Sequence, residues 1–151
     1  MMTRASPASH LRKLSLFERE PSPKTMSGGA IDLHHALSQF SDHWSPRRIA
    51  TLNDYDVRIA KIQGSFVWHK HDDTDELFLV LSGKLTIQFR PEYRENAVLG
   101  PNQLFVVPKG VEHCPRTDEG EEVAILLVEP RTVVNTGDAE KSEMTKEVVD
   151  L

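Results

Sequence analysis

Between residues 47 and 130 the chain alternates short apolar runs with turns that contain Gly and Pro. Within most runs the apolar residues occupy every second position, which is the period of a strand with one buried face. The pattern predicts strands at 47–52, 57–62, 67–71, 77–81, 84–89, 97–99, 104–107, 112–117 and 123–128. The alternation breaks between Ile59 and Ile62, which predicts a bulge in the second strand. Short strands at this spacing are typical of an all-β antiparallel barrel or jelly roll.

The residues before the strands follow a different period. Apolar residues at positions 30, 33, 37 and 40 recur at helical spacing, which predicts a short amphipathic helix that ends before Pro46. After Pro130 the apolar alternation stops, and the last residues predict either a frayed helix or an exposed tail. The expected organisation is a basic extension (1–26), a helical lead-in (27–46), a barrel (47–130) and a charged C-terminal tail (131–151).

The first 25 residues are basic and contain several Ser and Pro. Such an acid-poor start is similar to a mitochondrial transit peptide. The simpler interpretation is a disordered extension ahead of an alternative start at Met26. We therefore expect a cytoplasmic protein, with mitochondrial targeting by residues 1–25 as the alternative.

Composition narrows the function classes. The 151 residues carry a net charge of −5, which argues against a nucleic-acid partner because phosphate binding needs clustered Lys and Arg. No apolar run approaches the roughly 20 residues of a membrane helix. The single Cys114 excludes an internal disulfide. A small molecule is the expected partner.

Four residues from separate runs have the chemistry of metal ligands. His69 and His71 are one residue apart, so an extended strand places both side chains on the same face. Glu76 follows an acidic turn, and His113 follows a turn that contains Pro108 and Gly110. Three imidazoles and one carboxylate would hold a divalent first-row metal if the fold brings them together.

The spacing of these residues carries a family resemblance. The two motifs are Gly64-x4-His69-x-His71-x4-Glu76-x6-Gly83 and Gly100-x7-Pro108-x-Gly110-x2-His113. Over about residues 47–130 the chain resembles the small single-domain members of the cupin superfamily. It departs from the family pattern in two loop lengths and in Thr117, which stands where the family often has Asn. The resemblance implies a two-sheet barrel with a metal in its mouth, held by His69, His71, Glu76 and His113.

Strand parity extends this candidate site. The alternation places Val67 beside the histidines, Phe78 and Val80 on the face of Glu76, and Val111 on the face of His113, so these four residues are expected to line the pocket. Phe78 is the aromatic residue expected to touch a ligand, whereas Phe66 and Trp68 are expected to pack. Cys114 points to the other side of its strand, which predicts an inert buried thiol.

The chemistry of such a site leaves alternatives open. The first hypothesis is an oxidoreductase of dioxygenase type that uses Fe(II), with Mn, Zn, Ni or Cu as other metals, on a small oxygenated molecule such as a biosynthetic intermediate. The alternatives are a sugar-isomerase-like or lyase cupin and a non-enzymatic binding module. Isomerases and lyases need a further base, and no unambiguous one besides the ligands faces inward in the expected strands. Small cupins often form homodimers, and residues 27–52 are the expected contact.

Overall fold

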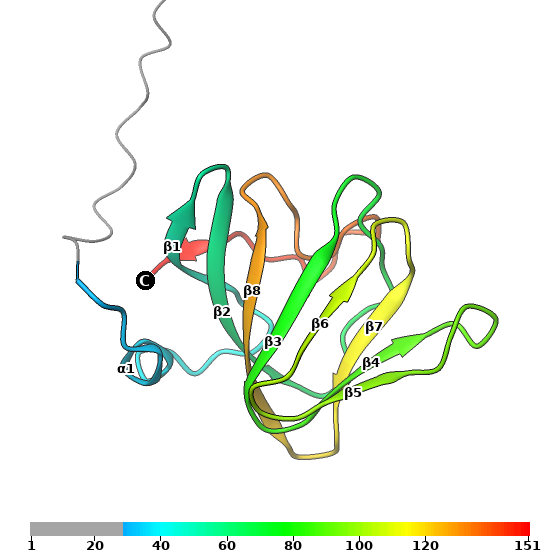
Figure 1. The fold of residues 1–151 in the computed structure, drawn as a ribbon, viewed down its shortest axis with the longest axis horizontal. Coiled ribbons are helices and arrows are strands. Elements are labelled where there is room, and N and C mark those ends of the chain that lie inside the picture. The colour runs from blue at the N-terminus through cyan, green and yellow to red at the C-terminus, as the bar shows by residue number, and fades with distance from the viewer. Residues whose placement is uncertain (1–28) are drawn as a thin grey trace, which may run out of the picture.

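The computed structural model describes residues 29–151, so the basic extension and its suggested targeting role lie outside the described residues. Figure 1 shows one short helix beside two layers of strands. The elements are α1 (Leu33–Leu37), β1 (Arg47–Leu52), β2 (Tyr55–Gln63), β3 (Glu76–Ser82), β4 (Leu85–Phe89), β5 (Ala97–Leu99), β6 (Leu104–Val107), β7 (His113–Thr117), β8 (Glu122–Pro130) and β9 (Val149–Asp150). Within these residues no helix is long and apolar enough to cross a membrane.

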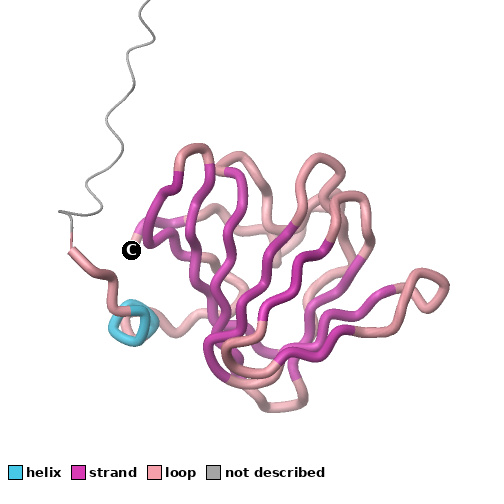
Figure 2. Tube along the Cα trace, viewed as in Figure 1, coloured by secondary structure: helices cyan, strands magenta, loops and turns pink. Residues whose placement is uncertain are grey.

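The strands form two sheets. The larger sheet has the order β6-β3-β8-β2-β1-β9, and the smaller sheet has the order β5-β4-β7. All neighbours pair antiparallel except β9, which runs parallel to β1. Strands dominate the trace in Figure 2, and this arrangement confirms the predicted all-β jelly roll with a short N-terminal helix.

The main core lies between the two sheets. In β3 the side chains of Glu76, Phe78 and Val80 are buried, while the intervening residues are only half-buried. Leu85 and Ile87 of β4 face them from the smaller sheet and are fully buried. Burying each such apolar side chain contributes roughly 1.5–3 kcal/mol, so this layer holds the sheets together.

A second, smaller core lies on the outer face of the larger sheet. There Ala36 of α1 packs with Ile49 of β1 and Ile59 of β2. The helix begins at Asp32, whose carboxylate accepts a hydrogen bond of 3.0 Å from the backbone N–H of His35. The helix has five residues, so it is shorter than the helix that the apolar spacing over residues 30–40 predicted.

This second core also explains a wrong prediction. Ile59 is buried under the helix while its neighbours Arg58 and Ala60 are buried on the inner face, so β2 loses its sequence alternation without a bulge. The pairing of β2 with β8 is continuous from Tyr55 to Gln63. The register shift lies instead in β1, between Arg48 and Ala50.

Two other segments differ from expectation. Residues 67–71 do not form a ladder strand; only isolated bridges occur there, His69 with His113 and, just before, Ser65 with Arg116. Residues 131–151 form turns and the strand β9 rather than a frayed helix, and most of them are exposed. Thr136 in this segment is only 1% exposed, so part of it packs against the barrel.

Candidate metal centre

The four candidate ligands converge at one end of the barrel. Glu76 is the first residue of β3 in the larger sheet, and His113 is the first residue of β7 in the smaller sheet. His69 pairs with the smaller sheet, because its backbone exchanges hydrogen bonds of 3.0 and 2.9 Å with His113. His71 follows two residues later on the same face, and all four side chains are buried.

The ligand atoms surround one carboxylate oxygen. Oε2 of Glu76 lies 2.8 Å from Nε2 of His113, 3.3 Å from Nε2 of His71 and 3.7 Å from Nε2 of His69. One potential ligand atom each from His69, His71 and Glu76 lies within 4.8 Å of the others, so these three could hold one ion. His113 adds a fourth donor beside the carboxylate.

The hydrogen bonds of the imidazoles test whether a metal fits. Nδ1 of His69 lies 3.0 Å from the carbonyl oxygen of Val67, and Nδ1 of His113 lies 3.0 Å from that of Val111. A carbonyl only accepts, so each Nδ1 donates a hydrogen, and in the neutral ring Nε2 is then the lone pair that a metal requires. A backbone carbonyl at the second ring nitrogen is the usual support of a metal-bound histidine.

Two of the Nε2 atoms around Glu76 have no hydrogen-bond partner among the described residues. Nε2 of His69 and Nε2 of His71 are buried and make no hydrogen bond with the described residues. Buried polar atoms are rarely left unpaired, and lone pairs that face a carboxylate repel it. A divalent cation would satisfy all of these atoms, so the residues fit a metal.

The same contacts set the charge of Glu76. Burial raises the pKa of this carboxyl, but the surrounding imidazoles of His113, His69 and His71 hold the pKa well below its usual range. Glu76 is therefore an anion at neutral pH and supplies the negative ligand of the set.

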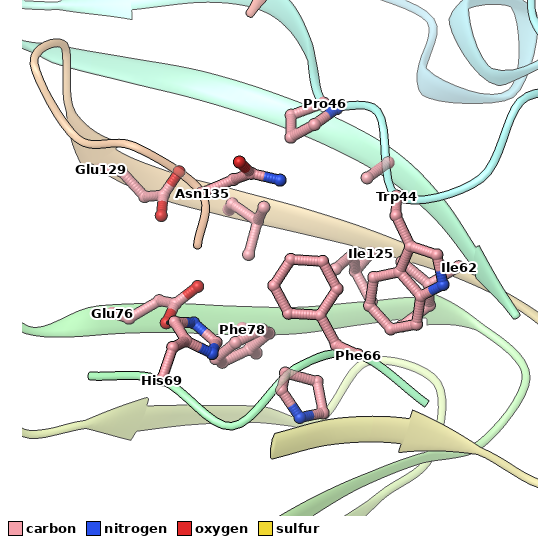
Figure 3. Close-up of a pocket in the computed structure, with 13 residues that line it drawn as sticks. Trp44, Pro46, Ile62, Phe66, His69, Glu76, Phe78, Ile125, Glu129 and Asn135 are labelled. Atoms are coloured by element: carbon pink, nitrogen blue, oxygen red, sulfur yellow. The ribbon is translucent and has the colours of Figure 1, made fainter. Parts of the chain in front are cut away.

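A narrow cavity of about 40 Å³ begins at this cluster. Figure 3 shows His69, Glu76 and Glu129 at one end and aromatic side chains at the other. Trp44 and Phe66 stack there with their ring centroids 4.7 Å apart. The lining is mostly apolar, from Trp44, Pro46, Ala60, Ile62, Phe66, His69, Glu76, Phe78, Pro115, Ile125, Leu127, Glu129 and Asn135.

Only part of the predicted lining is found there. Phe78 lines the cavity as expected, whereas Val67, Val80 and Val111 are not among its lining residues. Val80 is fully buried in the core one strand period beyond Phe78, past the end of the cavity. Val67 belongs to a segment that is not a ladder strand, so strand parity does not place its side chain.

Glu129 is the functional candidate that sequence reasoning missed. This carboxylate lines the cavity and is only 2% exposed. It lies on β8 two positions after Leu127 and four after Ile125, both of which also line the cavity. Strand parity could therefore have found it. Trp44 and Asn135 come from segments on either side of the barrel, and no pattern in the sequence indicates that they reach the site.

Glu129 belongs to a buried charged network. Its partner across the sheet is Asp56 of β2, and the register that pairs Leu77 with Val128 places Glu76 beside it on β3. Arg58, which is fully buried, donates a hydrogen bond of 2.6 Å to Oε2 of Glu129 and one of 3.3 Å to Asp56. Burial first, and then the charge of Glu76, raise the pKa of Glu129 to about 7 despite Arg58.

The C-terminal segment packs against the backbone between His69 and His71. The backbone N–H of Lys70 donates to Asp138, and the backbone N–H of Asp138 donates back to the carbonyl oxygen of Lys70. Gly137 has φ +50, and a Cβ added to it would overlap that carbonyl oxygen and lie 3.3 Å from Cδ2 of His69. This contact fixes the backbone between His69 and His71.

Cys114 is buried and free, as its position in the strand predicted. Its thiol lies 3.4 Å from the carbonyl oxygen of Phe66. Burial raises the pKa of this thiol. The uncharged thiol is a poor nucleophile, which fits a packing role.

Comparison with known proteins gives a consistent result. Residues 56–129 match the family model of the cupin domain. A crystal structure of a cupin-2 domain containing protein from Shewanella frigidimarina is 46% identical, with a TM-score of 0.63 over 67% of this chain and 94% of that one. A protein from Neisseria meningitidis shares the fold at 24% identity, with a TM-score of 0.59 over 68% of this chain and 99% of that one.

Among curated proteins, YdbB of Bacillus subtilis is 45% identical over 69 residues. The match covers 46% of this chain and 59% of YdbB, so the chain spans little more than half the length of that relative. With the paired histidine motifs, the two facing sheets and these matches, the chain belongs to the cupin family.

Proposed function

We propose that His69, His71, Glu76 and His113 hold one divalent first-row metal, with Fe(II) as the first candidate and Mn, Zn, Ni or Cu as others. The two orphaned Nε2 atoms beside an ionised carboxylate support this assignment. The set is three neutral donors and one anion, so a bound divalent ion keeps about one net positive charge.

We infer that the chain is a metal-dependent oxidoreductase of dioxygenase type that acts on a small oxygenated organic molecule. The observation that carries this function is a buried ligand cluster that opens into an enclosed apolar cavity. A metal of this class, when bound, polarises substrate oxygens and can exchange electrons with O2. Phe66, Phe78 and Leu127 exclude water around it, which strengthens every electrostatic contact inside.

The cavity also limits the substrate. The mostly apolar lining of the cavity favours an apolar fragment whose oxygens point to His69 and Glu76. Any larger part of a substrate would lie in the outer cleft, which His71 lines together with Lys70 and Asp138.

A second function is favoured by one observation. An isomerase or lyase needs a base besides the metal ligands, and Glu129 places a carboxyl inside the cavity. The sequence indicated no such base, and this absence favoured the oxidoreductase. Because Glu129 lies in the cavity, the argument against an isomerase or lyase is weaker.

One experiment separates these functions. The purified protein is analysed for bound metal, and O2 uptake is followed with small diols and hydroxyketones. An oxidoreductase consumes O2 only with substrate and yields products that carry added oxygen. An isomerase or lyase converts substrate without O2, and a binding module shows affinity without turnover. Failure to retain metal and to turn over any of these compounds would contradict the enzymatic proposal.

We also propose that the chain forms a homodimer. The expected contact, residues 27–52, includes Leu52, which is 58% exposed, and the edge strand β6 exposes Leu104 and Val106 as well. An open strand edge pairs readily with a second copy of the chain. Changing Leu104 or Leu52 to Glu is expected to shift the protein from dimer to monomer in size-exclusion chromatography with light scattering, and a monomeric parent protein would contradict the proposal.

A further inference from the structure

We propose that Glu129 is the acid–base residue of this site and takes a proton from a hydroxyl group of the bound substrate. The proposal rests on the proposed function, since it requires a small oxygenated molecule at the metal centre. It identifies the substrate class more closely, as a molecule that binds as an oxygen anion after it has lost a hydroxyl proton, such as an enol, an enediol or a hydroxamate.

The position of Glu129 supports this role. Its carboxylate lines the cavity together with Glu76 and His69, and Figure 3 shows both carboxylates at the same end of the cavity. A substrate oxygen that meets the metal ligands must therefore pass close to Glu129. The aromatic end of the cavity offers no other titratable group, because Trp44, Phe66 and Ile62 line it there (Figure 3).

The hydrogen bonds leave one oxygen of Glu129 available. Arg58 donates to Oε2, and no hydrogen bond to Oε1 occurs among the described residues. Arg58 is thus a positioning residue, which holds one oxygen and leaves the other for the cavity. A carboxylate needed only to pair with Arg58 would be expected to have both oxygens satisfied, as buried charged groups usually do.

Charged groups surround Glu129 in the larger sheet. Asp56 and Arg58 face Glu129 from β2, Glu76 faces it from β3, and the rings of His69 and His71 lie around Glu76. The carboxyl of Glu129 therefore lies beside the candidate metal ligands, at the end of the cavity where a substrate oxygen would bind.

The proposed step is balanced within the site. The substrate O–H bond breaks, its electron pair stays on the substrate oxygen, and the proton forms a bond to Oε1 of Glu129. The negative charge moves from the carboxylate to the substrate oxygen, where a cation held by the ligand cluster would stabilise it. The proton returns to an oxygen of the product when the product leaves.

Proton counting tests the role without turnover. Acetohydroxamic acid is a suitable probe because it is small, chelates through two oxygens and loses one proton when it does so. The metal-loaded protein is titrated with this probe in weakly buffered solution near pH 8, and the protons released per bound probe are measured. The wild type is expected to release few protons because Glu129 keeps them, whereas Glu129→Gln is expected to release about one.

A matched control makes the result decisive. Glu121→Gln, at an exposed position just before the same strand, is expected to behave as the wild type. Binding with about one proton released in the wild type, as in Glu129→Gln, would overturn the role of Glu129. If the metal-loaded wild type fails to bind the probe, the proposed function itself fails, and this proposal fails with it.

Discussion

Nε2 of His113 lies 2.8 Å from Oε2 of Glu76, while Nδ1 of the same ring lies 3.0 Å from the carbonyl oxygen of Val111. A neutral imidazole has one hydrogen, and the carbonyl of Val111 can only accept. In the neutral ring Nε2 is therefore a lone pair that faces an anion, as in the ring of His69 beside it. A cation at the centre of the cluster would satisfy both groups.

The contact at Gly137 gives the first prediction. Gly137→Ala is expected to destabilise the protein by roughly 2–4 kcal/mol, because the residue has φ +50 and its new Cβ would overlap the carbonyl oxygen of Lys70. Because the displaced backbone lies between His69 and His71, metal affinity is expected to fall about 10-fold or more. Chemical denaturation and a metal-chelator competition measure the two effects.

Gly120→Ala is the matched control for this change. Gly120 has φ +76, but a Cβ there meets no atom within 4 Å. This variant is expected to lose only about 1–2 kcal/mol from the backbone strain and to bind metal as the wild type does. Equal losses of metal affinity in both variants would show that the C-terminal segment does not support the ligands.

Much of this site could be predicted from the sequence. The His-x-His spacing, the later Glu76 and His113, and the parity of Phe78 were sufficient to indicate residues that the fold brings together. These predictions depend only on the period of a strand and on motif order. Glu129 was equally accessible, since Ile125 and Leu127 share its face, but an isolated acid near a strand end looks like a solvated one.

The other parts of the site and of the fold depend on contacts between distant segments, which leave no pattern in the local sequence. Trp44 reaches the cavity because the segment before β1 crosses the barrel, and Asn135 reaches it because the chain after β8 returns toward Lys70. The strand β9 has only two residues and forms because β1 offers a free edge. The burial of Ile59 under α1 likewise required knowledge of the helix position.

The raised pKa of Glu129 predicts how stability changes with pH in the metal-free protein. Its folded-state pKa of about 7 is above the ordinary value of 4.5, so the folded state binds more protons between these values. Proton binding by Glu129 therefore stabilises the folded state fully below about pH 4.5, and this stabilisation is lost as the pH rises through 7. The wild type is expected to lose roughly 1–3 kcal/mol relative to Glu129→Gln over this interval.

Thermal or urea denaturation of both proteins in the presence of a chelator measures this difference. The comparison reduces the opposite effect of Glu76, whose lowered pKa acts at lower pH in both proteins. Parallel stability curves from pH 5 to 7.5 would mean that Glu129 titrates at its ordinary value.

Cys114 gives a prediction of little change. Cys114→Ser is expected to keep its metal and its activity, because the thiol is buried, has a raised pKa and contacts the carbonyl oxygen of Phe66 rather than the metal ligands. The native thiol is also expected to react slowly with iodoacetamide until the protein is unfolded. An inactive Cys114→Ser variant with full metal content would instead indicate a catalytic thiol.

The most direct measurement of the central claim is the metal content of His71→Ala and His113→Ala by elemental analysis. The wild type should carry about one first-row metal per chain, and each variant should lose most of it while circular dichroism shows an intact barrel. His34→Ala, at an exposed position on α1, is the control and should keep its metal. Metal content equal to the wild type in both His71→Ala and His113→Ala would contradict the account.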